Sequence, residues 1–182
     1  MKTLKLCLFL LAVVVVGALV GCSTTSTKAA DVSDSIRASL DQAGFKDVSV
    51  TQDRAKGVVT LGGHVAADSD KLQAETIARS LAGTQVVSNQ IAVLPPGAES
   101  DAKKVNSDLD NGIESNLHAA LIKEKLHESV TFAVKNHVVT LTGNVDSQAK
   151  RARAEKVASE VLNVQQVVNE LQVKGQKATT SN

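Results

Sequence analysis

The sequence has no tryptophan and no tyrosine, and only three of its 182 residues are phenylalanine. Proteins that bind single-stranded nucleic acid usually stack the bases on aromatic rings, so this chain lacks the side chains for that mode of binding. An excess of one charge is also missing, because 20 lysines and arginines stand against 19 aspartates and glutamates. Long-range attraction to polyanions is therefore weak, and we expect no nucleic-acid partner.

Clustered catalytic chemistry is lacking as well. His64, His118, His127 and His137 are scattered, and no spacing is typical of a catalytic triad or a metal site. No glycine-rich phosphate loop precedes a helix, because the Gly-Gly pair at 62–63 lies inside a predicted strand. We therefore expect surface histidines and a non-enzymatic protein without catalytic residues, metal, cofactor or small-molecule substrate. Several polar groups meeting in a pocket would reopen the possibility of an enzyme.

The amino-terminal segment has a composition of its own. Basic residues 1–5 precede an apolar run over 6–20, which is followed by Gly21 and Cys22. This order is typical of an export signal. A permanent membrane-spanning helix is the alternative, but a span needs about 20 apolar residues and this run is shorter. The pattern favours a signal peptide over residues 1–21.

Leu19-Val20-Gly21-Cys22 resembles the lipobox of bacterial lipoproteins. The resemblance implies lipid attachment at Cys22, and Ser23 after it implies sorting to the periplasmic face of the outer membrane in the cell envelope. Two or more acyl chains hold a protein stably on a bilayer, so Cys22 would anchor the mature chain. An ordinary secreted protein is the alternative.

The lipobox also bears on cysteine chemistry and on charge. Cys7 leaves with the signal and Cys22 is modified, so no thiol remains for a disulfide or a metal. Removal of Lys2 and Lys5 leaves 18 basic against 19 acidic residues, a net charge of −1 with histidines neutral.

One stretch occurs twice: VVTLGGHV at 58–65 and VVTLTGNV at 138–145. At an offset of 80, residues 57–93 align with 137–173 without a gap. The first copy has the same residue as the second at Val58, Val59, Thr60, Leu61, Gly63, Val65, Ala74, Glu75, Ala78, Gln85, Val87, Asn89 and Val93. Two related units of about 65 residues follow from this repeat.

The same periodicities recur in each unit. In the first, apolar residues at helical spacing run from Val32 to Ala43, between Asp31 as a plausible N-cap and Gly44. Alternating residues then predict a β-hairpin over 48–65, followed by a helix over 74–81 and a strand over 87–93. A right-handed crossover would place both helices on one face of the sheet. We therefore predict an α+β protein of two tandem α-β-β-α-β two-layer sandwiches, each with a three-stranded sheet.

This order, with VVTLTGNV leading into Asp146-Ser147-Gln148-Ala149, resembles the BON domain, named for bacterial OsmY and nodulation proteins. The first unit departs from the pattern at 62–64 and 83–85. A lipobox before two such units is similar to a dual-BON outer-membrane lipoprotein or a lipidated OsmY-like protein. The resemblance implies a non-enzymatic periplasmic protein that associates with phospholipid membranes and supports envelope integrity under osmotic or other stress.

The expected boundaries follow from these patterns. They are a signal peptide at 1–21, a lipidated tether at 22–30, a first BON domain at 31–94, a linker at 95–107, a second BON domain at 108–174 and a disordered tail at 175–182. Pro95-Pro96-Gly97 breaks the preceding strand, and the polar residues after it predict a linker that lets the units move independently. Packing of one unit on the other would still add stability, because a domain of about 60 residues buries only about 60% of its unfolded surface.

Two repeated residue types within the units are interpreted as structural. Gly63 and Gly143 lie inside strands, where glycine usually marks close approach of another backbone, here of a helix crossing the sheet. Asn89 and Asn169 fall on the inward side of the last strand. A buried amide there must be hydrogen-bonded, and a helix end or turn is the expected partner.

The units differ most in charge on their second helix. Lys150, Arg151, Arg153 and Lys156 form a basic cluster, whereas the first unit has Asp70, Lys71, Gln73 and Thr76 at these positions. Beside a membrane, each cation contributes about 1 kcal/mol to binding anionic head groups. The four residues are therefore our candidate phospholipid contacts. The cluster is diluted by acidic neighbours, and a solvated helix face is the alternative interpretation.

We therefore expect a lipid-anchored envelope protein that binds membrane phospholipid. The alternative is a protein-interaction adaptor or chaperone-like factor, whose BON units bind other envelope proteins while Cys22 supplies only the location.

Overall fold

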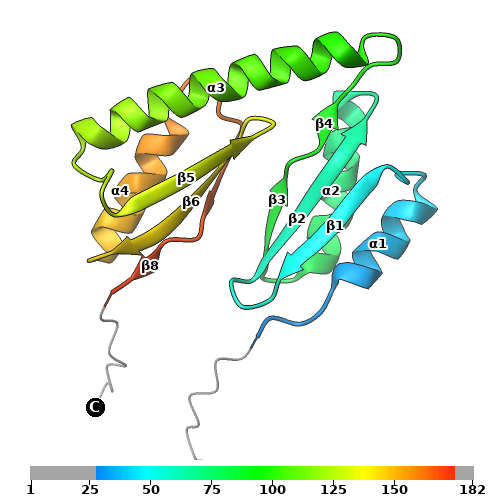
Figure 1. Cartoon of the computed structure of the whole chain (residues 1–182). Coiled ribbons are helices and arrows are strands. Elements are labelled where there is room, and N and C mark those ends of the chain that lie inside the picture. Colours follow the sequence, from blue (N-terminus) through cyan, green and yellow to red (C-terminus); the bar gives the residue numbers. More distant parts are fainter. Residues whose placement is uncertain (1–27, 175–182) are drawn as a thin grey trace, which may run out of the picture.

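The computed structural model describes residues 28–174, which form two α-β-β-α-β units. Figure 1 shows each unit as a sheet with its helices packed against one face. The predicted α+β fold of two tandem two-layer sandwiches is confirmed. The predicted signal peptide, the anchor Cys22, the start of the tether and the tail at 175–182 lie outside the described residues.

The first unit is built around one long strand, β2. Its elements are α1 (Ser33–Gln42), β1 (Val48–Asp53), β2 (Val58–Val65), α2 (Asp68–Ala82), β3 (Val86–Asn89) and β4 (Ala92–Val93). Strand β2 pairs antiparallel with β1 and parallel with both β3 and β4. The predicted last strand is thus a single line of chain with a break at residues 90–91, and both pieces pair with β2.

The second unit repeats this arrangement. Its elements are α3 (Glu99–Lys123), β5 (Val130–Lys135), β6 (Val138–Val145), α4 (Gln148–Ser159), β7 (Gln166–Asn169) and β8 (Gln172–Val173). Strand β6 pairs antiparallel with β5 and parallel with β7 and β8. In the sheet order, β3 and β7 are edge strands, and each follows the crossover helix of its unit, α2 or α4.

The core of each unit lies between the sheet and its two helices. In the first unit, Ile36 and Leu40 of α1 pack with Val59 and Leu61 of β2, and all four are fully buried. The second helix contributes small residues, Ala74 and its neighbours one and two turns on, so its backbone can approach the sheet closely. The equivalent buried cluster of the second unit is centred on Ile113, Leu117, Leu121, Val139 and Leu141.

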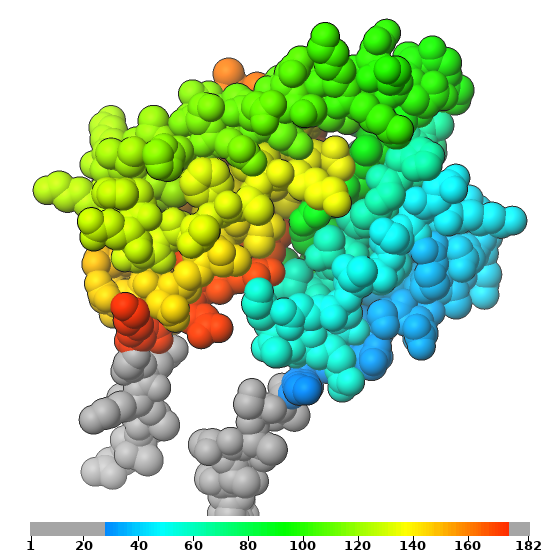
Figure 2. Space-filling model, viewed as in Figure 1, coloured from blue at the N-terminus to red at the C-terminus, as the bar shows by residue number. Residues whose placement is uncertain are grey.

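The segment predicted as a linker is mostly helix. Pro95-Pro96-Gly97 does form a turn, with Ala98 N–H donating to Pro95 O at 3.0 Å, but α3 begins at Glu99 and continues for 25 residues. At about 1.5 Å per residue the helix is about 37 Å long, and it lies along both units (Figures 1 and 2). Residues 99–107 of the predicted linker are therefore helical.

The physical reason lies in the residues on one side of the early helix. Ala102, Asn106 and Leu109 are half-buried and follow helical spacing toward Ile113. The helix contacts β4 of the first unit and β5 of its own. The linker helix thus contacts both units, while the predicted independent movement of the units stays a prediction.

Gly63 and Gly143 both have positive φ angles, +85° and +124°. A Cβ atom on Gly63 would lie 1.9 Å from Asp47 O, and one on Gly143 would lie 2.4 Å from Ser129 O. Close backbone approach therefore occurs at both glycines. The approaching backbone is the segment entering β1 or β5 and not the predicted helix.

Candidate functional site

The two units meet through contacts that the repeat relates to one another. Lys56, in the β1–β2 turn, pairs with Glu170 in the break between β7 and β8, with Nζ and Oε2 2.6 Å apart. Asn136, in the β5–β6 turn, donates from Nδ2 to Gln90 O at 2.8 Å, in the break between β3 and β4. Asn136 aligns with Lys56 and Glu170 with Gln90. These contacts are related as in a twofold-symmetric dimer, with each turn of one unit on the strand break of the other.

Three valines support the same junction. Val58, Val138 and Val168 form a buried apolar cluster on the sheet faces that turn away from the helices. In the alternation of the strands, Val58 and Val138 point away from the core residues Val59 and Val139. A signal was present in the sequence, because two consecutive valines begin each of these strands and put one apolar side chain on each face.

Asp110 of helix α3 binds the β5–β6 turn by hydrogen bonds. Asn136 and His137 have φ angles of 46° and 67°, a conformation that suits a tight hairpin turn. Their N–H groups donate to Asp110 Oδ2 and Oδ1, both at 2.8 Å. His137 is half-buried rather than on the surface, whereas His64, His118 and His127 are exposed as expected.

The edge of β3 is closed by a side chain from the other unit. Gln166 accepts from Asn89 N–H through Oε1 at 2.9 Å and donates from Nε2 to Val87 O at 2.7 Å. One amide thus satisfies a donor and an acceptor that an edge strand would otherwise present to a partner chain. Sequence reasoning missed Gln166, because a single glutamine carries no pattern that identifies its partner.

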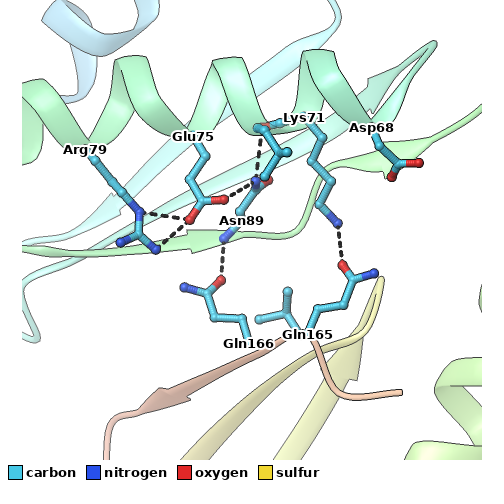
Figure 3. Close-up of a pocket in the computed structure, with 9 residues that line it drawn as sticks. Asp68, Lys71, Glu75, Arg79, Asn89, Gln165 and Gln166 are labelled. Carbon is cyan, nitrogen blue, oxygen red and sulfur yellow. Dashed lines mark hydrogen bonds and ion pairs between the residues drawn. The ribbon is translucent and has the colours of Figure 1, made fainter. Parts of the chain in front are cut away.

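A groove of about 350 Å³ lies beside this contact (Figure 3). Its lining residues are Asp68, Lys71, Leu72, Glu75, Arg79, Asn89, Val138, Gln165 and Gln166. Lys71 donates from Nζ to Gln165 Oε1 at 3.2 Å, and burial lowers the pKa of its ammonium group. Glu75 pairs with Arg79 at 2.5 Å. Most of the polar groups bond to one another, so the groove holds the units together rather than presenting an acid–base pair.

Asn89 anchors the last strand to the helix in the first unit. Its Nδ2 donates to Lys71 O at 3.2 Å and to Glu75 Oε2 at 2.9 Å, and its Oδ1 accepts from Ile91 N–H at 3.4 Å. The second unit repeats the three bonds from Asn169 to Arg151 O, Glu155 Oε2 and Leu171 N–H, at 3.3, 2.8 and 3.2 Å. The predicted hydrogen bonding of both amides to a helix turn is confirmed.

The structure separates the four candidate lipid contacts. Lys150, Arg153 and Lys156 lie on the exposed side of α4, with 45%, 62% and 75% of their side chains exposed. Arg151 turns toward the sheet and donates to Leu171 O at 3.1 Å and Asn169 O at 2.9 Å. Only three of the four cations therefore face outward together.

Each outward cation has an acidic neighbour. Lys150 pairs with Asp146 at 2.5 Å and Lys156 with Glu160 at 3.8 Å, while Arg153 Nε donates to Glu124 at 2.8 Å. The hydrogen bond from Lys150, followed by its charge, lowers the pKa of Asp146. Exposed pairs of this kind contribute little to stability, about 0–1 kcal/mol each, so the cations can exchange partners.

Between residues 28 and 174, no group of three or more histidines, cysteines, aspartates or glutamates lies close enough to hold a metal ion. None of the helices in that part of the chain is both long and apolar enough to span a bilayer.

Comparison with known proteins gives a family and two named relatives. The BON domain model matches residues 28–95 and 109–175. Osmotically-inducible protein Y of Escherichia coli is 33% identical over 130 residues, which are 70% of this chain and 62% of that protein. An uncharacterized protein in the gshII 5' region of Anaplasma centrale is 37% identical over 70 residues, 38% of this chain and 46% of its own.

Solved structures give only a weak likeness. Two structures of CdsD, a structural protein of the type III secretion system of Chlamydia trachomatis, match with TM-scores of 0.33 and 0.35 at 13% and 14% identity. They cover 79% and 76% of this chain and 66% and 90% of their own, and they carry no functional argument. The repeat, the two sandwiches and the two family matches agree with one another. The chain belongs to the BON domain family and contains two BON units.

Proposed function

We propose that the protein is held in the cell envelope by lipid at Cys22, on the periplasmic face of the outer membrane. There it binds phospholipid head groups and supports the envelope under osmotic stress. The observation that carries the proposal is the row of exposed cations on α4, Lys150, Arg153 and Lys156. The relative named for osmotic induction supports the physiological part.

The spacing of these cations suits a surface ligand. They recur every third residue, so they lie along one side of α4 rather than around it. Their present partners are surface carboxylates in weak pairs, and the phosphate of an anionic lipid can compete for the same donors. Arg151 is excluded from the contact, because its guanidinium holds two backbone carbonyls.

The tether would bring this surface to the bilayer. Ala29 N–H donates to Arg54 O at 2.9 Å, and Arg54 Nε donates to Ala29 O at 2.8 Å, so the chain is fixed to the first unit at this residue. Seven residues from Cys22 to Ala29 span at most roughly 25 Å. The lipid anchor would keep the protein on the bilayer, and the basic patch would add attraction to anionic head groups.

The test is sedimentation of a soluble chain beginning at Ser23 with vesicles of anionic or zwitterionic phospholipid, at low and moderate salt. We expect binding to anionic vesicles that weakens with salt and is lost when Lys150, Arg153 and Lys156 are replaced by Glu. A matched control replaces the exposed Lys46, Lys103 and Lys104 by Glu, which changes the net charge equally. This control should retain most of the binding.

Two results would overturn the proposal. Equal loss in both charge-reversed variants would mean that net charge, not the α4 surface, decides binding. No sedimentation with either lipid would mean that membrane contact comes from Cys22 alone, and would favour the adaptor that binds envelope proteins.

A further inference from the structure

The two units share a surface, and within residues 28–174 a glutamine amide bridges only the copy in the first unit. In the first unit it is the edge of β3 beside α2, and in the second it is the edge of β7 beside α4. The aligned residue pairs on these surfaces are Leu72 and Ala152, Glu75 and Glu155, Arg79 and Ser159, Val87 and Val167, and Asn89 and Asn169. The fold therefore builds the same type of site twice.

The first copy shows what this surface binds. The amide of Gln166 bridges Val87 O and Asn89 N–H at 2.7 and 2.9 Å, and the neighbouring Gln165 accepts from Lys71. Figure 3 shows Gln166 reaching Asn89 of β3 and Gln165 reaching Lys71 of α2. The occupant of the first site is thus an extended segment that presents glutamine side chains.

The second copy has the same backbone groups at its edge. In the parallel pairing with β6, Val168 and Glu170 direct their backbone groups inward, as the bond from Glu170 N–H to Leu141 O at 2.9 Å shows. Val167 and Asn169 therefore direct theirs outward. Within residues 28–174, Asn169 O accepts from Arg151, but no group bonds to Asn169 N–H or Val167 O.

Strand β7 contacts β3 of the first unit, and its edge is hollowed on the side of α4. A hollow of about 520 Å³ is lined by Ala152, Glu155, Lys156, Ser159 and Val167. Alanine and serine replace the leucine and arginine of the first unit, so the second site is wider. Among the described residues no cation pairs with Glu155, whereas Arg79 pairs with its counterpart Glu75.

We propose that the α4–β7 surface binds an extended polypeptide segment of another protein that presents a glutamine or asparagine side chain. The amide bridges Val167 O and Asn169 N–H as Gln166 bridges the β3 edge, and a lysine or arginine nearby in the segment pairs with Glu155. The main-chain edge supplies affinity and the hollow supplies selectivity. A second copy of this chain does not fit, because its Gln166 is engaged and Val86 stands at the equivalent position of its first unit.

The experiment uses the soluble chain from Ser23, labelled with ¹⁵N, and a synthetic peptide of residues 163–169, the segment that fits the first site. We expect amide shifts at Val167, Asn169 and the exposed side of α4 around Ala152. Replacement of the second glutamine of the peptide by leucine should weaken binding about tenfold, because the bridging amide is lost.

A pair of variants locates the site. Ala152→Trp fills the hollow and should also weaken peptide binding about tenfold, whereas Ala149→Trp, at an exposed position outside the hollow, should leave binding unchanged. The proposal is overturned if the shifts map only to α2 and β3, if the leucine peptide binds as tightly, or if Ala152→Trp binds like the wild type.

Discussion

The edge of β3 in the first BON unit is covered by a hydrogen-bonded amide, whereas the aligned edge of β7 in the second unit has no such cover among the described residues. Gln166 covers the edge of β3, and Arg54 holds the incoming chain at Ala29 beside the end of β1. At the edge of β7 no such amide is present among the described residues. Duplication has therefore made one unit a ligand of the other, and within residues 28–174 no equivalent amide bonds to the second copy of the shared surface.

The residues that the units share and those that differ have separate roles. Gly63 and Gly143 allow the same close backbone approach, and Asn89 and Asn169 make the same three hydrogen bonds. Gln166, by contrast, aligns with Val86, and this difference decides which edge is covered. The common residues specify the fold, and the differing residues specify the assembly.

The largest expected effect comes from breaking a feature that both units share. Gly63→Ala and Gly143→Ala each place a Cβ against a backbone oxygen at a positive φ, so each should lower the free energy of unfolding by about 3 kcal/mol or more. Gly63→Ala should be the worse, because its overlap is closer. Urea denaturation followed by circular dichroism measures both.

Gly112 provides the control for these glycines. It lies within α3 with no atom within 4 Å of an added Cβ. Gly112→Ala should stabilise the protein by about 0.5–1 kcal/mol through helix propensity. Similar loss in all three variants would contradict the assignment of strain to the strand glycines.

The next effect compares how much the two shared asparagines contribute to stability, given their different burial. Asn89 is 3% exposed and Asn169 is half-buried. Removing either amide takes away its three hydrogen bonds and leaves the N–H of Ile91 or Leu171 without its partner, so Asn89→Ala should cost about 2–3 kcal/mol and Asn169→Ala about 1–2 kcal/mol. Thermal unfolding compares the two, and a larger loss at Asn169 would reverse the comparison.

A third change removes the amide that covers the β3 edge. Gln166→Val installs the residue of the first unit, and it should expose the β3 edge while both cores stay folded. Amide hydrogen exchange at Asn89 should accelerate about tenfold, with Leu61 in the core unchanged. Gln165→Val removes only the bond from Lys71 and serves as the control. Unchanged exchange at Asn89 in Gln166→Val would mean that another group protects it.

The smallest effect concerns pH. The hydrogen bond to Glu170 raises the pKa of Lys56 above the ordinary lysine value. The pair therefore stabilises the junction fully below the unfolded pKa of lysine, and this contribution is lost as pH rises through the higher folded pKa. The loss should stay below about 1 kcal/mol, because 42% of the Lys56 side chain is exposed to solvent screening.

Stability measured between neutral and strongly alkaline pH checks this contribution. Lys56→Met should lack the part of the alkaline loss that comes from the pair, and Lys46→Met, at an exposed position, should keep it. Identical alkaline profiles in both variants would remove Lys56 from the junction.

The fold of each unit could be predicted because its signals are local. The spacing of Ile36 and Leu40 and the alternation along β2 identify elements without reference to distant residues, and the repeat supplies a second reading of the same pattern. Asn89 and Gly63 could also be interpreted, since strand position alone restricts an amide or a glycine.

The junction could not be predicted, because its partners are far apart in sequence and chemically ordinary. Gln166 and Asn136 match many environments, and their contacts exist only after both units have folded. The early part of α3 has polar residues that suit a linker and an exposed helix equally well. Val58 and Val138 are the residues from which a junction could have been predicted, since an apolar residue on an outer sheet face requires a partner.

Hydrogen exchange in the unmodified soluble chain tests most directly whether one edge is covered and its counterpart is open. The comparison is between the backbone amides of Asn89 and Asn169, which occupy aligned positions. We predict that Asn89 exchanges at least about tenfold more slowly, because its N–H donates to Gln166. Equal rates, or slower exchange at Asn169, would contradict the account.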